Sequence, residues 1–266
     1  MATSVDTITG AMNVYVMTQE ASARNLANVN TPGFKRNLAM IEAARRNDRV
    51  LMVAYCMRFH PLVIRMKELI DAKTYGECFQ VSIWTEQHTQ RDPSDWMCRA
   101  GTLGGGQLFS HGCHYIDILL WYLGRPVKGV HIGSHYGTEW MEREGTSNVT
   151  MTFESGAMGY HFGTWGAKGS RLKYSFHAHC TEGMIEAAIT GGKLIAHVKG
   201  KEEVLLTAEH TKPTDAEMMH FLDCIESGAT PITSAADSLR GLRVIWKLYE
   251  AEERGALADL SGATIL

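Results

Sequence analysis

The sequence predicts an α+β fold built on a large, mostly antiparallel open sheet with flanking helices. The first observation is a succession of short segments with strand-like alternation or apolar content between residues 78 and 206. The second is a set of apolar residues at three- and four-residue spacing on both sides of that region, which is typical of amphipathic helices. The third is one continuous apolar run, 50–55, which suits a buried parallel strand. A remnant αβ unit of a second sheet and an N-terminal helix complete the prediction.

The first elements along the chain are helical. A mildly amphipathic stretch rich in alanine and asparagine covers 7–28 and ends at a Thr31-Pro32-Gly33 turn. Apolar residues then recur at helical spacing over 37–47 and precede the strand-like run 50–55. A linking helix begins at His60-Pro61 and ends between residues 71 and 76.

The middle of the chain carries the predicted sheet. Cys78–Glu86 alternates as a strand does, and a helix over 111–122 follows it. Further strands are predicted at 127–133, 147–154, 157–165, 171–179, 183–188, 193–198 and 203–206. Two closing helices, 215–227 and 234–254, flank a break at 228–231.

Composition excludes several classes of protein. With 266 residues, 45% hydrophobic and 21% charged, the chain can bury a core in one or two domains. A net charge of −3 without a lysine or arginine block argues against a nucleic-acid partner. No apolar run approaches the roughly 20 residues that cross a bilayer, and no signal peptide precedes the rest, so we expect no membrane. The six cysteines form no CxxC pair, which indicates reduced thiols in the cytoplasm.

The N-terminal segment carries a recognisable run. Residues 24–36 read RNLANVNTPGFKR, and this resembles the NNLANVNTPGFKR signature of flagellar rod and hook proteins. The resemblance covers only residues 1–36, and no further rod domain is recognised after it. We interpret the segment as part of a fusion or of a misassembled gene.

A second resemblance covers about 225 residues, from residue 40 to the C-terminus. Its motifs are MIEAARRN at 40–47, VAYCMRFHP at 53–61 and, most specific of all, GGGQLFSHGCHYID at 104–117. It continues through 153–157, 166–171, 181–183, 221–225 and 237–240. In order and spacing these motifs resemble the later portion of Gfo/Idh/MocA-type NAD(P)-dependent sugar oxidoreductases.

The resemblance implies a catalytic site near His114. In such enzymes a Rossmann domain holds the nicotinamide against a substrate on the sheet domain, and the histidine after the glycine run acts as acid/base. An imidazole with a pKa near 6.5 is suited to taking a hydroxyl proton near neutrality. Asp117, one helical turn on, either orients His114 or a substrate hydroxyl, or simply pairs locally. Ser110 stands where family members often have an aspartate.

The resemblance also assigns binding residues. It places Tyr55 and Arg58 at the cofactor, and Trp84, His88, Trp96 and Arg99 in the walls of the pocket for a sugar or polyol. For Trp84 and Trp96 the alternative is a place in the core.

Two family elements are missing from the sequence. There is no GxGxxG turn, which brings backbone amides to a pyrophosphate, and no Glu-Lys-Pro segment. The family cofactor is NAD or NADP, and we expect this chain not to bind it. The predicted division is a flagellar-rod-like segment at 1–36, a Rossmann remnant with the linking helix at 37–75, a substrate and oligomerisation sheet at 76–208, and C-terminal helices at 209–266.

The expected function is therefore that of a Gfo/Idh/MocA member that keeps its substrate domain, lacks the dinucleotide-binding half and is inactive as this chain. Three alternatives stay open. The chain is a non-catalytic module that binds a sugar or forms a homo-oligomer through the open sheet face; it is a flagellar rod-related fusion; or it holds a metal, with His177 and His179 on one strand and His111, Cys113 and His114 as further ligands.

Overall fold

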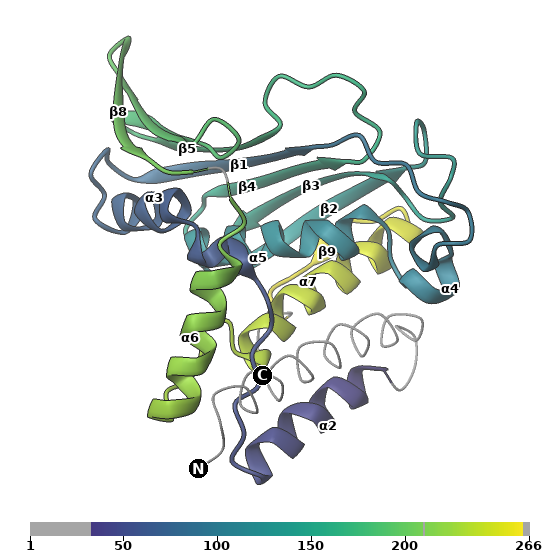
Figure 1. Cartoon of the computed structure of the whole chain (residues 1–266). Coiled ribbons are helices and arrows are strands. Elements are labelled where there is room, and N and C mark those ends of the chain that lie inside the picture. Colours follow the sequence, from purple (N-terminus) through teal and green to yellow (C-terminus); the bar gives the residue numbers. More distant parts are fainter. Residues whose placement is uncertain (1–32, 210, 263–266) are drawn as a thin grey trace.

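The computed structural model describes residues 33–209 and 211–262, and Figure 1 shows one broad sheet with helices beneath it. The predicted helix over 7–28 lies outside the described residues, as does the flagellar-like segment up to residue 32. The predictions for that segment therefore stay untested.

The described strands form one nine-stranded sheet in the order β8-β7-β6-β5-β1-β4-β3-β2-β9. Only β1 and β4 pair in parallel, and the other pairs are antiparallel. This confirms the predicted α+β class with a mostly antiparallel open sheet. The strands are β1 (Cys78–Glu86), β2 (Pro126–Ser134), β3 (Thr146–Phe153), β4 (Met158–Thr164), β5 (Tyr174–Cys180), β6 (Gly183–Ala188), β7 (Lys193–Val198), β8 (Lys201–Thr207) and β9 (Ala258–Asp259).

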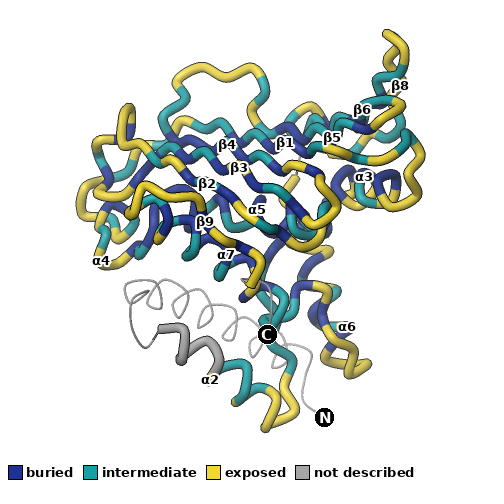
Figure 2. The backbone as a smooth tube through the Cα atoms, turned by 180° about the vertical axis from the view of Figure 1, so that it is seen from behind, coloured by how far each residue is buried: buried dark blue, intermediate teal, exposed yellow. Residues whose placement is uncertain are grey.

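One face of the sheet is covered by three helices: α3 (Pro61–Asp71), α5 (Cys113–Leu123) and α7 (Ala235–Glu253). Strand alternation decides which side chains meet them. In β1, Val81 and Ile83 are fully buried against these helices, whereas Trp84 points to the opposite face. Figure 2 shows the buried residues following the central strands and the helices beneath them. Two other helices, α2 (Gly33–Arg46) and α6 (Thr214–Ser227), lie farther from the sheet (Figure 1).

The linking helix starts as predicted. His60 is the N-cap of α3, where its Nδ1 accepts a hydrogen bond of 3.3 Å from the Leu62 backbone N–H, and Pro61 occupies the first turn. Proline fits there because its missing N–H would have no partner inside the helix. A short 3-10 turn, η1 (Cys56–Phe59), precedes the cap.

The predicted strand over 50–55 is not formed. Within the described residues this run makes a single isolated bridge, between Met52 and Ser234. Val53 N–H donates to Thr233 O at 2.9 Å, and Ala235 N–H donates to Leu51 O at 3.2 Å. The run is apolar enough for a strand, but the segment beside which it forms its bridge is the stretch at the start of α7, which is too short to make a ladder.

Four short elements were not predicted from the sequence: the turns η1 and η2 (Trp96–Cys98), helix α4 (Ala100–Leu103) and the two-residue strand β9. The helix predicted over 111–122 is present, but it follows a π-helical turn, η3 (Leu108–Gly112). The extra residue of such a turn changes the direction of nearby side chains, and π-turns often occur at functional sites.

Candidate active site at the start of helix α5

The glycine run before α5 is explained by close packing. Gly104 has φ +85°, in the region that favours glycine, and it ends α4. A Cβ on Gly106 would lie 2.1 Å from the carboxylate of Glu144. That carboxylate accepts hydrogen bonds from the Leu108 backbone N–H, at 3.3 Å, and from the Tyr249 hydroxyl. The run therefore anchors the start of η3 and α5 without any phosphate.

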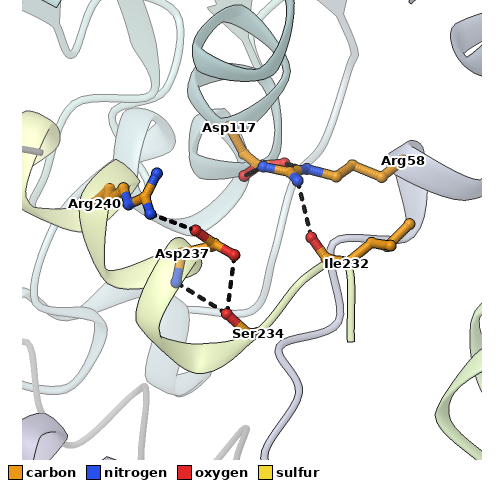
Figure 3. A network of polar contacts seen from close by, with 6 residues as sticks. All are labelled: Arg58, Asp117, Ile232, Ser234, Asp237 and Arg240. Atoms are coloured by element: carbon orange, nitrogen blue, oxygen red, sulfur yellow. Dashed lines mark hydrogen bonds and ion pairs between the residues drawn. The ribbon is translucent and has the colours of Figure 1, made fainter. Parts of the chain in front are cut away.

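Asp117 and Arg58 form a buried ion pair (Figure 3). Arg58 Nε and Nη2 each donate to one carboxylate oxygen of Asp117 at 2.7 Å. Arg58 Nη1 also donates to the carbonyl oxygen of Ile232 at 2.9 Å, and the guanidinium lies 5.3 Å from the ring centroid of Trp121. Burial raises the pKa of the Asp117 carboxyl, although the bonds from Arg58 act in the opposite direction. The pair ties η1 to α5 and to the segment before α7.

This arrangement bears on two predicted roles. Asp117 is 2% exposed and both of its oxygens are bonded to Arg58, so local pairing is what the structure displays for it. Arg58 uses three N–H groups inside the protein, and its side chain is only 12% exposed. Neither charge is left free to meet a ligand.

His114 lies in the first turn of α5, beside Tyr55. The two rings meet edge to face with centroids 5.4 Å apart. Within residues 33–209 and 211–262, the buried Nδ1 of His114 has no hydrogen-bond partner. Burial lowers the pKa of His114 to about 4 and raises the pKa of Tyr55 well above its usual range, so both side chains are neutral at pH 7. The structure thus brings two predicted site residues together, and one buried ring nitrogen of His114 is not bonded to any described residue.

A second histidine, His111, lies at the centre of a polar cluster that sequence reasoning did not assign. Its Nε2 is 3.1 Å from Gln87 Nε2, 3.3 Å from the Tyr174 hydroxyl and 3.5 Å from the Tyr115 hydroxyl. Its Nδ1 is 3.3 Å from Gln107 Nε2, and burial lowers its pKa well below the usual value. The rings of His111 and His114 are 6.4 Å apart, so the cluster adjoins the catalytic candidate.

A cavity of about 350 Å³ opens next to this cluster. Tyr174 belongs to both, since its hydroxyl contacts His111 and its side chain lines the cavity. Lys168, Lys173 and His88 are also in the wall. The Glu86 carboxylate, which lines the cavity too, accepts hydrogen bonds from Ser170 Oγ at 2.7 Å and from the Lys173 backbone N–H at 3.0 Å. The lining therefore carries more positive than negative groups.

The remaining predicted pocket residues are not gathered here. Trp84 lies on the open face of the sheet, with its ring 5.5 Å from the rings of Tyr160 and Phe162. Trp96, in η2, is 50% exposed and therefore not part of the core. Arg99 is exposed at the start of α4. His88 is the one of the four that lines the cavity.

For the metal alternative, the described part of the chain holds no group of three or more His, Cys, Asp or Glu side chains arranged to bind an ion. His177 and His197 each contact Glu186 instead, at 3.9 and 3.0 Å. Among the described helices, none combines the length and apolar character that crossing a membrane requires.

Comparison with known proteins places this geometry in context. Residues 63–186 match the family model of the GFO/IDH/MocA C-terminal domain. A curated relative, D-xylose 1-dehydrogenase (NADP(+)) 2 of Haloferax volcanii, is 27% identical over 227 residues, which cover 79% of this chain and 64% of the relative. The chain therefore spans less than two thirds of the length of that enzyme.

Solved structures share the fold. The aldose-aldose oxidoreductase of Caulobacter crescentus, complexed with glycerol, superposes with a TM-score of 0.74 at 24% identity, covering 84% of this chain and 68% of that one. Levoglucosan dehydrogenase in complex with NADH and L-sorbose gives 0.74 at 19% identity, covering 85% and 70%. Residues 63–186 are therefore similar to the C-terminal domain of the GFO/IDH/MocA family, and the fold of the chain is similar to that of these oxidoreductase structures.

Proposed function

We propose that this chain supplies the sugar- or polyol-binding platform of a Gfo/Idh/MocA oxidoreductase and does not turn over a substrate by itself. The observation that carries the proposal is the Nδ1 of His114, which has no partner among the described residues; it lies next to Tyr55 and adjoins the His111 cluster, which borders a cavity through Tyr174. A buried nitrogen without a partner is costly, and a substrate hydroxyl that donates to it would remove that cost. His114, held neutral by burial, is the group that would accept the hydroxyl proton.

The residues present do not fit a whole dinucleotide. Tyr55 offers an aromatic surface beside His114, but the guanidinium of Arg58 is already bonded to Asp117 and Ile232. No glycine-rich turn of the GxGxxG type occurs in the sequence, and the described strands all lie in one sheet without a βαβ unit that would present such a turn. No hydride step is therefore assigned to this chain.

Titration with NADH and NADPH, followed by nucleotide fluorescence, tests the proposal. We expect no saturable binding below millimolar concentration, because the sequence has no GxGxxG turn whose backbone amides would hold the pyrophosphate. Without that cradle the cofactor is not positioned for hydride transfer either. Micromolar affinity for either nucleotide would contradict this. If turnover is detected, His114→Ala should abolish it, and unchanged turnover in that variant would remove His114 from the reaction.

The cavity favours a sugar that carries an acidic group. Lys168, Lys173 and His88 line it, and the Glu86 carboxylate already accepts hydrogen bonds from Ser170 and from the Lys173 backbone. We expect D-gluconate to bind more tightly than D-glucose, by about 2–5-fold, as for a partly exposed ion pair, and to bind less tightly as salt is added. Amide NMR shifts of residues around Tyr174 measure both affinities.

Lys173→Gln should remove the preference for gluconate. Lys199→Gln is the matched control, because Lys173 and Lys199 share a left-handed backbone, with φ of 51° and 49°, and Lys199 lies in the β7–β8 turn. An equal loss in both variants would mean that the cavity does not select the anion.

A second function is favoured by the open face of the sheet. Ile132, Met158 and Val204 are 63%, 44% and 51% exposed, and strand register places them on the same face as Trp84. No described helix covers this face (Figure 1). We propose that two or more copies of the chain associate through it. Ile132→Lys should lower the mass measured by light scattering to that of a monomer, and a monomeric wild-type protein would exclude the association.

A further inference from the structure

A pair of cysteines lies where the two halves of the sheet meet. Cys78 begins β1, Cys180 ends β5, and the two are register partners in the antiparallel β1–β5 pair. Opposed residues of such a pair have Cα atoms about 4.5–5.5 Å apart. Disulfides form at Cα separations of about 4.4–6.8 Å. Both residues are free thiols in the structure, so the backbone is already set for a bond that has not formed.

Hydrogen bonds fix the backbone on the outer side of the pair, and a β-bulge interrupts the regular register on its inner side. Beyond it, Thr181 N–H donates to Glu77 O at 3.0 Å, and Glu77 N–H donates to Thr181 Oγ1 at 3.1 Å. On the inner side the register shifts by one residue between Cys78 and Gln80. Such a bulge lets the strand bend locally, so the two sulfur atoms can reach bonding geometry without breaking the rest of the ladder.

The two thiols also differ in access and in charge. Cys180 is 7% exposed, whereas Cys78 is half-buried. The interaction between the two thiols raises the pKa of Cys78 and lowers the pKa of Cys180. The Cys78 thiol donates to the carbonyl oxygen of Gln80 at 3.7 Å, and the Cys180 thiol donates to the carbonyl oxygen of Ala178 at 4.0 Å. Cys78 is therefore the thiol that an external disulfide can reach, and Cys180, with the lower pKa, more readily supplies the thiolate for a second, internal attack.

We propose that Cys78 and Cys180 are a redox-active site that closes into a cross-strand disulfide with a small-molecule disulfide, such as oxidised glutathione, as its oxidant. Cys78, the more accessible of the two, gives up its thiol proton as its sulfur attacks one glutathione sulfur; the glutathione S–S bond breaks, and one glutathione leaves as thiol with that proton. The Cys180 thiolate then attacks the Cys78 sulfur of this mixed disulfide, and the second glutathione leaves as thiol. The protein loses two electrons, and one oxidised glutathione becomes two reduced ones.

The bond would join the β5–β8 half of the sheet to the half that contains β1–β4. It closes a loop of about a hundred residues, and cross-links over loops of this length restrict the unfolded chain most. For a chain of this size we expect the midpoint of thermal unfolding to rise by about 5–15 °C on oxidation and to return when dithiothreitol is added. This step does not depend on turnover of a sugar.

The experiment treats the full-length protein with oxidised glutathione, alkylates the remaining thiols with iodoacetamide and maps peptides by mass spectrometry. Wild-type protein should lose two of its six alkylatable thiols and yield a peptide pair that joins Cys78 to Cys180. Cys180→Ser should stop at a glutathione adduct on Cys78. Cys78→Ser should acquire little adduct, because Cys180 is buried. Cys224→Ser, a change at a buried thiol in α6, should behave as the wild type does.

Six alkylated thiols in treated wild-type protein would overturn the proposal, and so would a disulfide that joins any other two cysteines. An unchanged unfolding midpoint in protein shown to contain the bond would overturn the proposed effect on the sheet. The wild-type peptide map decides the question even if a serine variant does not fold.

Discussion

The buried pair of Arg58 and Asp117 gives the sharpest prediction for stability. Arg58→Met keeps most of the volume of the side chain and removes its charge. The variant loses two bonds of 2.7 Å to Asp117, one of 2.9 Å to Ile232 O, and the contact of the guanidinium with Trp121. Asp117, at 2% exposure, is left without a counter-ion. Removing one partner of a buried ion pair typically costs about 3–5 kcal/mol.

The size of the loss should depend on pH, because the stranded carboxyl of Asp117 can take up a proton. Protonating a carboxyl of ordinary pKa near 3.9 costs about 1.36 kcal/mol per pH unit, which is about 4 kcal/mol at pH 7 and about 1.5 kcal/mol at pH 5. Burial already raises this pKa in the wild type, and losing Arg58 raises it further. A raised carboxyl pKa favours the folded state at low pH and costs stability as pH rises. The deficit of Arg58→Met should therefore be largest at pH 7 and smaller at pH 5.

Urea unfolding at pH 7 and pH 5 measures the effect, with Arg65→Met as a matched control. Arg65 pairs with Glu68 at 2.7 Å on the surface, where the two side chains are 48% and 55% exposed, so that variant should lose under about 1 kcal/mol. Arg58→Met/Asp117→Leu should recover most of the loss, since no buried charge is left alone. Equal losses in the Arg58 and Arg65 variants, or a deficit that does not shrink at pH 5, would refute the reasoning.

Two further predictions concern buried histidines. Burial lowers the pKa of His114 to about 4 and that of His161 to about 3, so their contribution to stability is complete above the unfolded pKa of about 6.5 and is lost as pH falls toward those values. His161→Phe should reduce the slope of the unfolding free energy against pH, between pH 6 and 4, by the amount that corresponds to the uptake of about one proton on unfolding. An unchanged slope would contradict this. Glu252→Ala should cost about 1–3 kcal/mol by thermal unfolding, because Glu252 accepts from the Gly133 N–H and pairs with His131, each at 2.7 Å; Glu253→Ala, exposed on the same helix, should change little.

Much of the fold follows from local pattern. Cys78–Glu86 was predicted with the bounds that β1 has, because its alternation and its neighbouring turns can both be recognised from the residue types. The run 50–55 has an equally clear pattern and is not a strand, because a strand also needs a partner of sufficient length. Pattern gives the tendency of a segment, whereas pairing depends on residues far away in the chain.

The candidate site shows the same difference between local motifs, which the sequence reveals, and contacts between distant residues, which it does not. His114 and Tyr55 were found through motifs, and the structure brings them together. His111 was missed as the centre of a cluster because its partner Tyr174 lies 63 residues away and reaches it only through the register of β5. Trp84 was assigned to the pocket, although its alternation with Ile83 already places the two side chains on opposite faces of β1. The alternation within β1 was therefore enough to place Trp84 on the face opposite Ile83. The contact between His111 and Tyr174 joins two separate elements, and the sequence alone does not predict it.

Polar geometry alone does not mark an active site in this molecule. Ser147 Oγ lies 2.9 Å from His131 Nε2, and His131 Nδ1 lies 2.7 Å from a Glu252 oxygen, which is the order of groups in a hydrolytic triad. Yet Ser147 is fully buried and each ring nitrogen of His131 is already bonded, so no substrate can reach a reactive atom. His114 has fewer contacts, but its Nδ1 lacks a partner in the described chain and the adjoining His111 cluster borders a cavity. A ring nitrogen without a protein partner, adjoining a cluster that borders a cavity, is what separates the candidate site from a network that only holds β2, β3 and α7 together.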